Sequence, residues 1–285
     1  MQGTRSFRYP ACNAQRAGGQ VAAGGRDSST RWSSAALPAA RSDAQQRRNG
    51  WIIPCNQAEK LLMTTVLITG ANRGIGLALT RLYRERGDAV IGACREASPE
   101  LAATGARVEA GVDVREEASV QALAQRLDGT RIDLLVLNAG ILRRDDWDEL
   151  GTAAFEAMRE QYEVNALGPL RVARALDEHL APEARIGIIT SRMGSVGDNQ
   201  SGGSYGYRAS KAAVNAIGRS MAMDLQPRGI AVFLLHPGFV STDMVGGRGE
   251  ISPEQAARQL AARLDSLGLA ETGTFWHSNG SPLPW

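Results

Sequence analysis

The stretch that decides the fold is Thr69-Gly70-Ala71-Asn72-Arg73-Gly74-Ile75-Gly76, which continues a short apolar run at residues 66–69. It has the composition of a strand end, a glycine-rich turn and a helix start. Glycine suits such a turn because the backbone angles are unusual and because a Cβ would keep a pyrophosphate at a distance. The N-terminus of the following helix offers free N–H groups to phosphates. The spacing GxxxGxG therefore favours a dinucleotide-binding turn over an ordinary glycine-rich turn.

From residue 64 onward, short apolar runs alternate with amphipathic stretches of helical period. The expected strands are residues 66–69, 89–93, 107–112, 132–137, 185–190, 230–235 and 273–276, and the expected helices are residues 75–86, 116–127, 153–180 and 210–225. Strands that alternate with helices over this length predict right-handed βαβ crossovers. We therefore expect an α/β domain built on a doubly wound parallel sheet of about seven strands.

Residues 1–62 differ from the rest of the chain. They are rich in Ser, Gly, Ala, Gln and Arg, lack apolar periodicity and carry a net charge of +6. Such a segment buries too little apolar surface to offset its chain entropy, so we predict that it is disordered and that the domain comprises residues 63–285. We favour a translated extension upstream of Met63, and an Arg-rich, Ser-rich transit peptide is the alternative.

Cysteine usage and charge limit the class of protein. Cys12, Cys55 and Cys94 form no CxxC motif, so we expect neither a disulfide framework nor a zinc site, and a reducing, cytoplasmic setting. Targeting to an organelle by residues 1–62 is the alternative. No apolar run approaches the ~18 residues of a membrane span. Because the whole chain carries +2 and residues 1–62 carry +6, the remainder carries −4, and we expect no nucleic-acid or membrane partner.

The residue after the second expected strand bears on the type of cofactor. In a typical NAD site, an acid about 20 residues beyond the glycine turn binds the ribose 2′-hydroxyl. Here Arg95 stands at that place, and Arg73 lies within the turn. Guanidinium groups suit a 2′-phosphate, so we predict NADPH rather than NADH. Glu96, directly after Arg95, argues against this preference. The alternative is that Arg73 and Arg95 are ordinary surface arginines with no role in cofactor binding.

The third and fourth strands are followed by Asp113-Val114 and by Asn138-Ala139-Gly140. The carboxyl ends of parallel strands share one edge of a sheet, where open α/β sheets bind ligands. We therefore expect these five residues to line the cofactor site. Considered separately, Asp113 would be an ordinary loop acid, and residues 138–140 would be an ordinary turn.

Lysine is scarce, since the chain has only Lys60 and Lys211 against 30 Arg. Lys211 follows Tyr207 by four residues, and on a helix these positions share a face. A nearby ammonium favours the phenolate, so we expect a Tyr207 pKa below ~10 and a usable proton donor or acceptor near neutral pH. An ordinary helical tyrosine beside a solvated lysine is the alternative. Tyr205 lacks such a partner, because Ala209 stands four residues on.

The ordered set TGxxxGIG, NAG, a helix asparagine, a serine, YxxxK and PG resembles the short-chain dehydrogenase/reductase family over residues 64–285. Within that family the chain is similar to the C-factor and sniffer-type carbonyl reductases, through residues 191–195, 202–211 and 280–285. The resemblance implies a Rossmann-type fold with strand order 3-2-1-4-5-6-7 and hydride transfer with a nicotinamide cofactor. It implies no particular substrate.

The resemblance also implies catalytic roles for four residues. Tyr207 resembles the general acid/base, and Lys211 the residue that binds the nicotinamide ribose and lowers the tyrosine pKa. Ser191 resembles the serine that hydrogen-bonds the substrate carbonyl, with Ser195 as the alternative. Asn165 resembles the helix asparagine that supports a water-linked proton relay. Because asparagine competes for backbone hydrogen bonds inside a helix, we also expect a local distortion there.

After the sixth strand, the family places a Pro-Gly turn against the nicotinamide carboxamide. The resemblance assigns cofactor contacts here to Pro237, Gly238, Val240 (through its backbone) and Thr242. His236 is interpreted as structural. His179 and His277 have no carboxylate or cysteine at ligand spacing, so no metal site is expected.

Together, residues and resemblance predict an NADPH-dependent oxidoreductase that interconverts a small-molecule carbonyl and alcohol. A C-factor-like signalling or dinucleotide-sensing protein with little turnover is the alternative. Residues 244–252 are expected to carry substrate specificity. Small residues at positions 212, 213, 216, 218 and 222 would allow close helix contact, and the family commonly dimerises through this helix, so the resemblance implies a homodimer or homotetramer. The alternative is that this helix face packs on the sheet.

Overall fold

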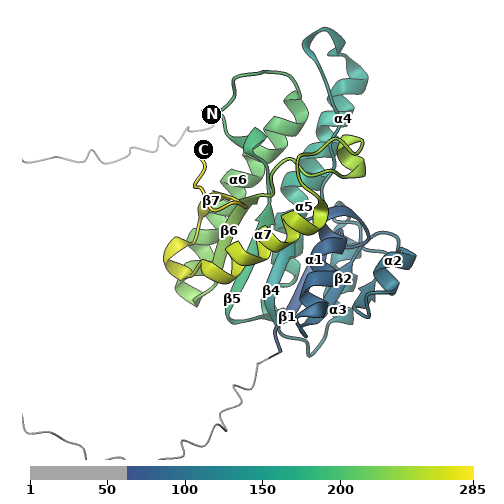
Figure 1. Ribbon diagram of the computed structural model, residues 1–285, viewed down its shortest axis with the longest axis vertical. Helices are drawn as coiled ribbons and strands as arrows, with labels where there is room; N and C mark the ends of the chain where they lie inside the picture. The colour runs from purple at the N-terminus through teal and green to yellow at the C-terminus, as the bar shows by residue number, and fades with distance from the viewer. Residues whose placement is uncertain (1–62) are drawn as a thin grey trace, which may run out of the picture. The chain divides into compact units, whose positions relative to one another are not determined.

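The computed structural model describes residues 63–285, so the predictions made for residues 1–62 lie outside the described part of the chain. Within it, seven strands form one parallel sheet in the order β3-β2-β1-β4-β5-β6-β7 (Figure 1). The strands are β1 (Thr65–Thr69), β2 (Ala89–Ala93), β3 (Arg107–Glu109), β4 (Ile132–Leu137), β5 (Leu180–Ile189), β6 (Ala231–His236) and β7 (Thr274–His277). The predicted doubly wound sheet and its strand order are confirmed.

Helices cover both faces of this sheet. They are α1 (Gly74–Glu85), α2 (Pro99–Ala102), α3 (Glu117–Arg126), α4 (Thr152–Tyr162), α5 (Gly168–Ala175), α6 (Tyr205–Leu225) and α7 (Pro253–Ser266). Helices α3, α5 and α6 pack in one apolar layer, and α1 and α7 pack in the other. Because successive strand side chains point to opposite faces, Leu67 of β1 enters the first layer, whereas Val66 and Ile68 enter the second.

The prediction of one continuous helix over residues 153–180 is wrong. The structure has α4, then a π-helical turn at Glu163–Leu167, then α5, and β5 already begins at Leu180. Pro169 is the physical reason, because it lacks an N–H and its ring would clash with the carbonyl of residue 165 in a regular α-helix. The wider π turn relieves that conflict. The distortion expected at Asn165 is thereby confirmed.

Three element boundaries also differ from expectation. Strand β3 ends at Glu109 rather than at residue 112, and β5 begins five residues early at Leu180. The early part of β5 is irregular, since Glu183 adopts a φ of 62°. Helix α6 begins at Tyr205 rather than at residue 210, so Tyr207 lies in its first turn.

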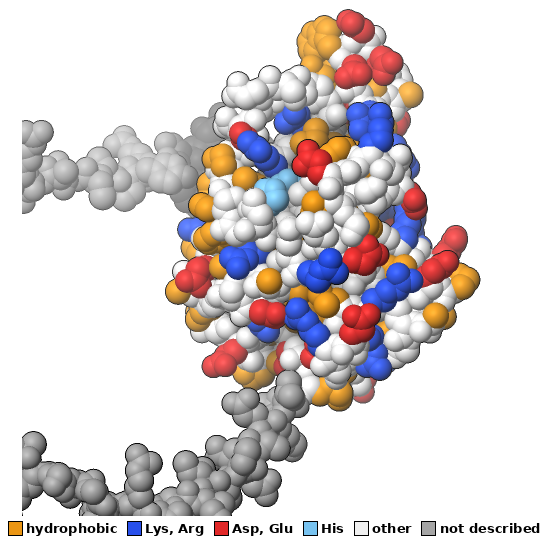
Figure 2. Space-filling model, in the orientation of Figure 1, with side chains coloured by type: hydrophobic (Ala, Val, Ile, Leu, Met, Phe, Trp, Pro, Cys, Tyr) orange, Lys and Arg blue, Asp and Glu red, His pale blue; other side chains and the backbone are white. Residues whose placement is uncertain are grey.

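The surface carries no large field of one sign on the face drawn in Figure 2, where acidic and basic side chains are interspersed. Among residues 63–285, no helix combines the length and the apolar character that crossing a membrane requires.

All strands run in the same direction, so their carboxyl ends meet at one edge of the sheet. At that edge, the glycine-rich turn after β1 packs against the residues that follow β4. This contact is close because Gly76 has no side chain. Segments about 70 residues apart in sequence thereby form one floor for a ligand.

Gly76→Ala is expected to destabilise the domain. A Cβ at this position would lie 2.2 Å from the Gly70 carbonyl oxygen and 2.7 Å from Asn138 Nδ2, so the turn would have to move away from β4. Overpacking of this kind costs ~1–3 kcal/mol in the free energy of unfolding. Gly151→Ala is the matched control, because a Cβ there meets no atom within 4 Å. Denaturant unfolding measures both variants, and equal stabilities would contradict the close packing.

Candidate active site

A cavity of about 740 Å³ runs along the carboxyl edge of the sheet. This volume lies within the ~300–1,000 Å³ usual for cofactor and substrate sites. Most of the residues predicted to bind a cofactor line it: Gly70, Asn72, Arg73, Gly74, Ile75, Arg95, Asp113, Val114, Asn138, Ala139, Gly140, Tyr207, Lys211, Pro237 and Thr242. Gly76, Gly238 and Val240 are not among the lining residues. Gly76 lies beneath the turn, and Val240 is buried and bridges to Ile251.

The glycine turn is held open by its own backbone and by the end of β4. Gly70 and Gly74 have φ values of 66° and 53°, a region that favours glycine. The Asn138 amide donates to the carbonyl oxygens of Thr69 (3.0 Å) and Gly70 (3.2 Å). Asn138 therefore fixes the turn, and its side-chain amide is engaged with backbone. Gly74 and Ile75, the first residues of α1, line the cavity, where the N-terminus of the helix can receive phosphate groups, so the turn fits a dinucleotide.

Ser98 makes a contact at this turn that was not predicted from sequence. Ser98 caps α2 by accepting from the Leu101 N–H, and its hydroxyl donates to the Asn72 carbonyl oxygen at 2.8 Å. On the other side, a Cβ at Gly74 would lie 3.3 Å from Thr242 Cγ2, so Thr242 borders the turn as expected. The N-cap pattern Ser98-Pro99 was the available signal for the Ser98 contact.

Tyr207 and Lys211 meet at the same cavity. The Lys211 ammonium lies 5.8 Å from the centroid of the Tyr207 ring and donates to the Ile189 carbonyl oxygen at 2.9 Å. A Cβ at Gly140 would lie 3.7 Å from Lys211 Nζ, which places the lysine directly beside the residues that follow β4. The side-chain pair inferred from helix spacing is thus brought together with the glycine turn.

A buried acid, Asp145, fixes the first turn of α6, and it was not predicted from the sequence. The Asp145 side chain is 4% exposed and accepts hydrogen bonds from the backbone N–H groups of Tyr205 and Gly206. It therefore acts as an N-terminal cap supplied from a loop about 60 residues upstream. Only the tertiary fold brings it there, so no local capping pattern could have revealed it.

The expected lowering of the Tyr207 pKa is wrong. Burial raises the pKa of Tyr207 to about 12, and its hydrogen bond with the Ser191 side chain offsets only part of that rise. Burial likewise lowers the pKa of Lys211 to about 8. Desolvation disfavours the charged form of each group and is the largest cause of both shifts. Tyr207 is therefore a neutral phenol at neutral pH.

Asn165 lies behind the cavity and is 1% exposed. Its Oδ1 accepts from the Ile141 N–H at 2.8 Å, and its Nδ2 donates to the Ile141 carbonyl oxygen (2.9 Å) and to Ser210 Oγ (3.0 Å). Ser210 in turn donates to the Tyr207 carbonyl oxygen at 2.8 Å. Asn165 therefore connects the π turn, the loop after β4 and the helix that carries Tyr207.

Ser191 and Ser195 have different surroundings. Ser191 is 7% exposed, follows β5 and contacts the Tyr207 side chain. Ser195 Oγ instead donates to the Trp285 carbonyl oxygen at 3.0 Å. The geometry thus favours Ser191 over Ser195 as the serine beside Tyr207.

His236 fits its structural interpretation. It packs edge-to-face on His277, with ring centroids 4.8 Å apart. Burial, followed by the effect of His277, lowers the pKa of His236 to about 3, so the ring is neutral near neutral pH. Within residues 63–285, no group of three or more His, Cys, Asp or Glu side chains could hold a metal ion.

The family model described as short chain dehydrogenase matches residues 64–251. The chain belongs to the short-chain dehydrogenase family. It is 45% identical over 230 residues to the 1-hydroxy-2-glutathionyl-2-methyl-3-butene dehydrogenase of Rhodococcus sp. (strain AD45), which covers 78% of this chain and 100% of that one. It is 40% identical over 156 residues to the C-signal protein of Myxococcus xanthus, covering 54% of this chain and 93% of that one.

Solved structures agree with this assignment. The NADPH-bound carbonyl reductase from chicken fatty liver has a TM-score of 0.70 and 29% identity, and the match covers 78% of this chain and 99% of that one. The resemblance drawn from the motifs is confirmed, and this short-chain dehydrogenase is an oxidoreductase.

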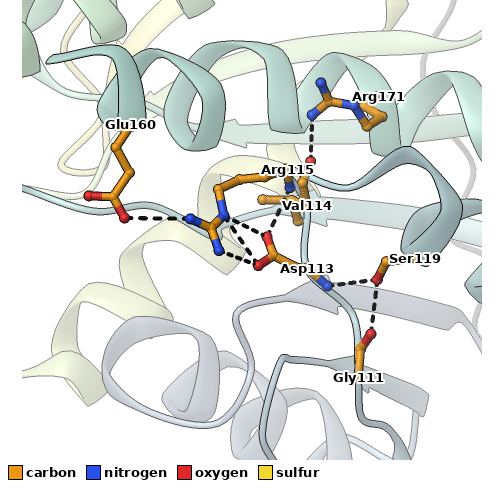
Figure 3. A network of polar contacts seen from close by, with 7 residues as sticks. All are labelled: Gly111, Asp113, Val114, Arg115, Ser119, Glu160 and Arg171. Atoms are coloured by element: carbon orange, nitrogen blue, oxygen red, sulfur yellow. Dashed lines mark hydrogen bonds and ion pairs between the residues drawn. The ribbon is translucent and has the colours of Figure 1, made fainter. Parts of the chain in front are cut away.

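At the other end of its cavity, this short-chain dehydrogenase has a network of charges, only part of which was predicted. Asp113 accepts from the Arg115 guanidinium, which also lies 3.7 Å from Glu160 of α4 (Figure 3). Arg143 approaches the same carboxylate at 3.5 Å. Arg115, Arg143 and Glu160 line the cavity and were missed, because nothing in their local sequence marks them as neighbours. Arg95 is exposed and forms no ion pair within residues 63–285.

Because Lys211 is buried in the folded protein, the free energy of unfolding should depend on pH. The unfolded chain holds the lysine proton up to its reference pKa of ~10.4, whereas the folded protein releases it near pH 8. Between these values the unfolded state binds more protons, so stability rises with pH. Measured without added cofactor, the wild type should gain about 2 kcal/mol relative to Lys211→Met between pH 7 and pH 10. Urea unfolding at several pH values measures this, and a pH-independent difference would refute it.

Proposed function

We propose that residues 63–285 form an NADPH-dependent oxidoreductase that interconverts a carbonyl and an alcohol, with Tyr207 as general acid/base. One observation carries the proposal: the Tyr207–Lys211 pair lines the same cavity as the glycine turn. A redox cofactor held by that turn would extend along the carboxyl edge toward Tyr207. When bound, it supplies the hydride, and the protein supplies position and electrostatics.

In the reductive direction, Ser191 and Tyr207 hold the carbonyl oxygen by hydrogen bonds. Hydride addition to the carbonyl carbon leaves negative charge on that oxygen, and Tyr207 transfers its phenolic proton there. The raised Tyr207 pKa suits this direction, because the phenol keeps its proton until charge develops nearby. Lys211, whose ammonium stands beside the ring, then stabilises the phenolate.

Asn165 contributes by holding the helix that carries Tyr207 and Lys211 in place. Its three hydrogen bonds and the link through Ser210 fix the first turn of α6 against the π turn. We propose that this bracing keeps Tyr207 and Lys211 aligned beside the proton relay implied by the family. The π turn therefore lies where the orientation of these side chains matters most.

Two arginines support NADPH as the cofactor. Arg95 is exposed at the end of β2, and Arg73 in the glycine turn is engaged only at 3.7 Å with Asp243. Both line the cavity, and guanidinium groups suit a 2′-phosphate. The chicken carbonyl reductase of similar fold binds NADPH. Glu96 lines the cavity beside Arg95 and is exposed, where solvent screens its charge.

The substrate belongs to the class of small carbonyls or alcohols. The relative from Rhodococcus acts on an alcohol that carries a glutathionyl group, so thioether alcohols of this type belong in the test. Met244 lines the cavity, and Gly246 and Gly247 beyond it adopt positive φ, which suits a short specificity loop at residues 244–252. A panel of aldehydes, ketones, quinones and glutathionyl alcohols, followed by NADPH absorbance, identifies the substrate.

A signalling function is the second candidate, because the C-signal protein is 40% identical over 156 residues. The convergence of Ser191, Tyr207 and Lys211 favours catalysis over a purely sensing role. Absence of turnover across the substrate panel, with dinucleotide binding intact, would favour signalling instead.

Assembly and setting complete the proposal. Ala212 and Ala216 are small and not buried, which suits packing of α6 against a second copy, whereas Gly218 and Ala222 are buried inside the domain. We propose a homodimer or homotetramer in the cytoplasm. Residues 1–62 are proposed to lie outside the catalytic domain.

Tyr207→Phe should lower kcat by ~10² to 10⁴, because the proton donor is lost while the ring remains. Tyr205→Phe is the matched control, since Tyr205 lies on the same helix turn, is 37% exposed and packs against Trp147 with its ring tilted by 55°. Steady-state rates of carbonyl reduction measure both variants. Near-normal turnover by the Tyr207 variant would refute the proposed mechanism.

Arg95→Asp should shift the preference from NADPH toward NADH. The substitution removes the free guanidinium and places a carboxylate where it would repel a 2′-phosphate, so the ratio of kcat/KM values should fall by about 10-fold or more. Arg258→Asp, an exposed position on α7 away from the cavity, is the control. An unchanged ratio in the Arg95 variant would remove this residue from cofactor recognition.

A further inference from the structure

A chain of alternating charges borders the cavity beyond Arg95. Arg115 binds both carboxylate oxygens of Asp113, with Nε at 3.1 and 3.2 Å and Nη2 at 2.7 Å. The backbone N–H of Arg115 also donates to Asp113 at 3.0 Å. On its far side Arg115 lies 3.7 Å from Glu160, which Arg143 shares at 3.5 Å. Figure 3 shows the Arg115 guanidinium lying between the two carboxylates.

The backbone around this chain of charges is itself tied down. Ser119 Oγ donates to the Gly111 carbonyl oxygen and accepts from the Asp113 N–H. Arg171 of α5 donates to the Val114 carbonyl oxygen at 2.6 Å (Figure 3). The Asp113 carboxylate therefore has a fixed position on the cavity wall, 22% exposed, and cannot turn away from a ligand.

Asp113 stands close to the arginine that suits a 2′-phosphate. The Gly111 N–H donates to the Arg95 carbonyl oxygen at 3.0 Å, so the segments after β2 and β3 run side by side. Arg115 holds the pKa of Asp113 below its usual value, to which Arg95 adds a smaller effect. Asp113 is thus ionised at neutral pH, and alone it would place a negative charge beside any bound phosphate.

We propose that Arg115 determines the preference for a 2′-phosphorylated dinucleotide by neutralising the Asp113 carboxylate, leaving Arg95 to contact the phosphate. This inference rests on the proposed function, because it needs a dinucleotide with its adenosine end at β2 and β3. A carboxylate and a phosphate that lie close together repel each other, and salt weakens this repulsion. Pairing with Arg115 removes most of the repulsion between the Asp113 carboxylate and a 2′-phosphate.

Arg115 is a positioning residue rather than a phosphate ligand. Its guanidinium is engaged by two carboxylates, Asp113 and Glu160, whereas Arg95 has no ion pair within the described part of the chain. A phosphate would have to compete with both acids for Arg115. The same residue type therefore serves two purposes at this end of the cavity, according to what each arginine faces.

The test is the ratio of dissociation constants for NAD⁺ and NADP⁺, measured by isothermal titration. Adenine and nicotinamide contacts are common to both ligands, so the ratio isolates the 2′-phosphate. Arg115→Met should lower the preference for NADP⁺ about 10-fold, with a smaller loss in high salt. Asp113→Asn combined with Arg115→Met should restore it, because the uncompensated charge is gone. Asp113→Asn alone should raise it.

Arg126→Met is the matched control, because this guanidinium pairs with Glu109 of β3 at 2.6 Å and does not line the cavity. It should leave the ratio unchanged. An unchanged ratio in Arg115→Met would overturn the inference. Failure of the double variant to recover would also overturn it, since Arg115 would then contact the phosphate directly. Should Arg115→Met fail to fold, Asp113→Asn decides alone, and no rise in NADP⁺ preference overturns the inference.

The proposed function fails on a different result. A wild type that binds NAD⁺ as tightly as NADP⁺ contradicts the proposed NADPH preference. The inference about Arg115 concerns only how the ratio changes between variants, so the two outcomes are separable.

Discussion

The close packing of the glycine turn after β1 against the end of β4 is the contact on which the rest of the site depends. Gly76 permits it, because its Cβ would overlap the Gly70 carbonyl oxygen. Hydrogen bonds then close the contact: Thr69 Oγ1 accepts from the N–H groups of Asn138 and Ala139, and the Asn138 amide donates back to the turn. Through Gly140, the same segment borders Lys211. The glycine turn and the Tyr207–Lys211 pair therefore have one fixed spacing.

The protonation of that pair is governed by burial more than by charge. Helix spacing correctly brings the phenol and the ammonium to one face, and an argument from the charges alone then lowers the tyrosine pKa. In the folded chain, desolvation acts on both groups and favours the neutral form of each. This outcome suits a proton donor, which has to remain protonated until negative charge appears on a neighbouring oxygen.

The opposite end of the cavity illustrates how context assigns roles to a common residue. Arginine is the usual cation of this chain, yet Arg95 faces solvent while Arg115 is enclosed by two acids. Arg95 is available to a ligand, and Arg115 offsets the negative charge of Asp113 on the cavity wall. Between the two ends, the buried Asp145 cap and the Asn165 network hold α6 in register with the sheet. The two ends of the cavity are thus formed by separate groups on one edge of the sheet.

The sequence by itself determined the doubly wound parallel sheet, the glycine turn and the Tyr207–Lys211 pair, because these depend on local spacing and on the regular handedness of βαβ units, and its resemblance to a known family implied the strand order. It also indicated a distortion at Asn165, although the expected helix over residues 153–180 concealed the effect of Pro169. Only the tertiary structure decided the Asp145 cap, the pairing of Arg115 with Asp113 and Glu160, and the direction of the Tyr207 pKa. These features arise from burial and from contacts between segments far apart in the chain. Local patterns carry no information about either, because both are created when the chain folds.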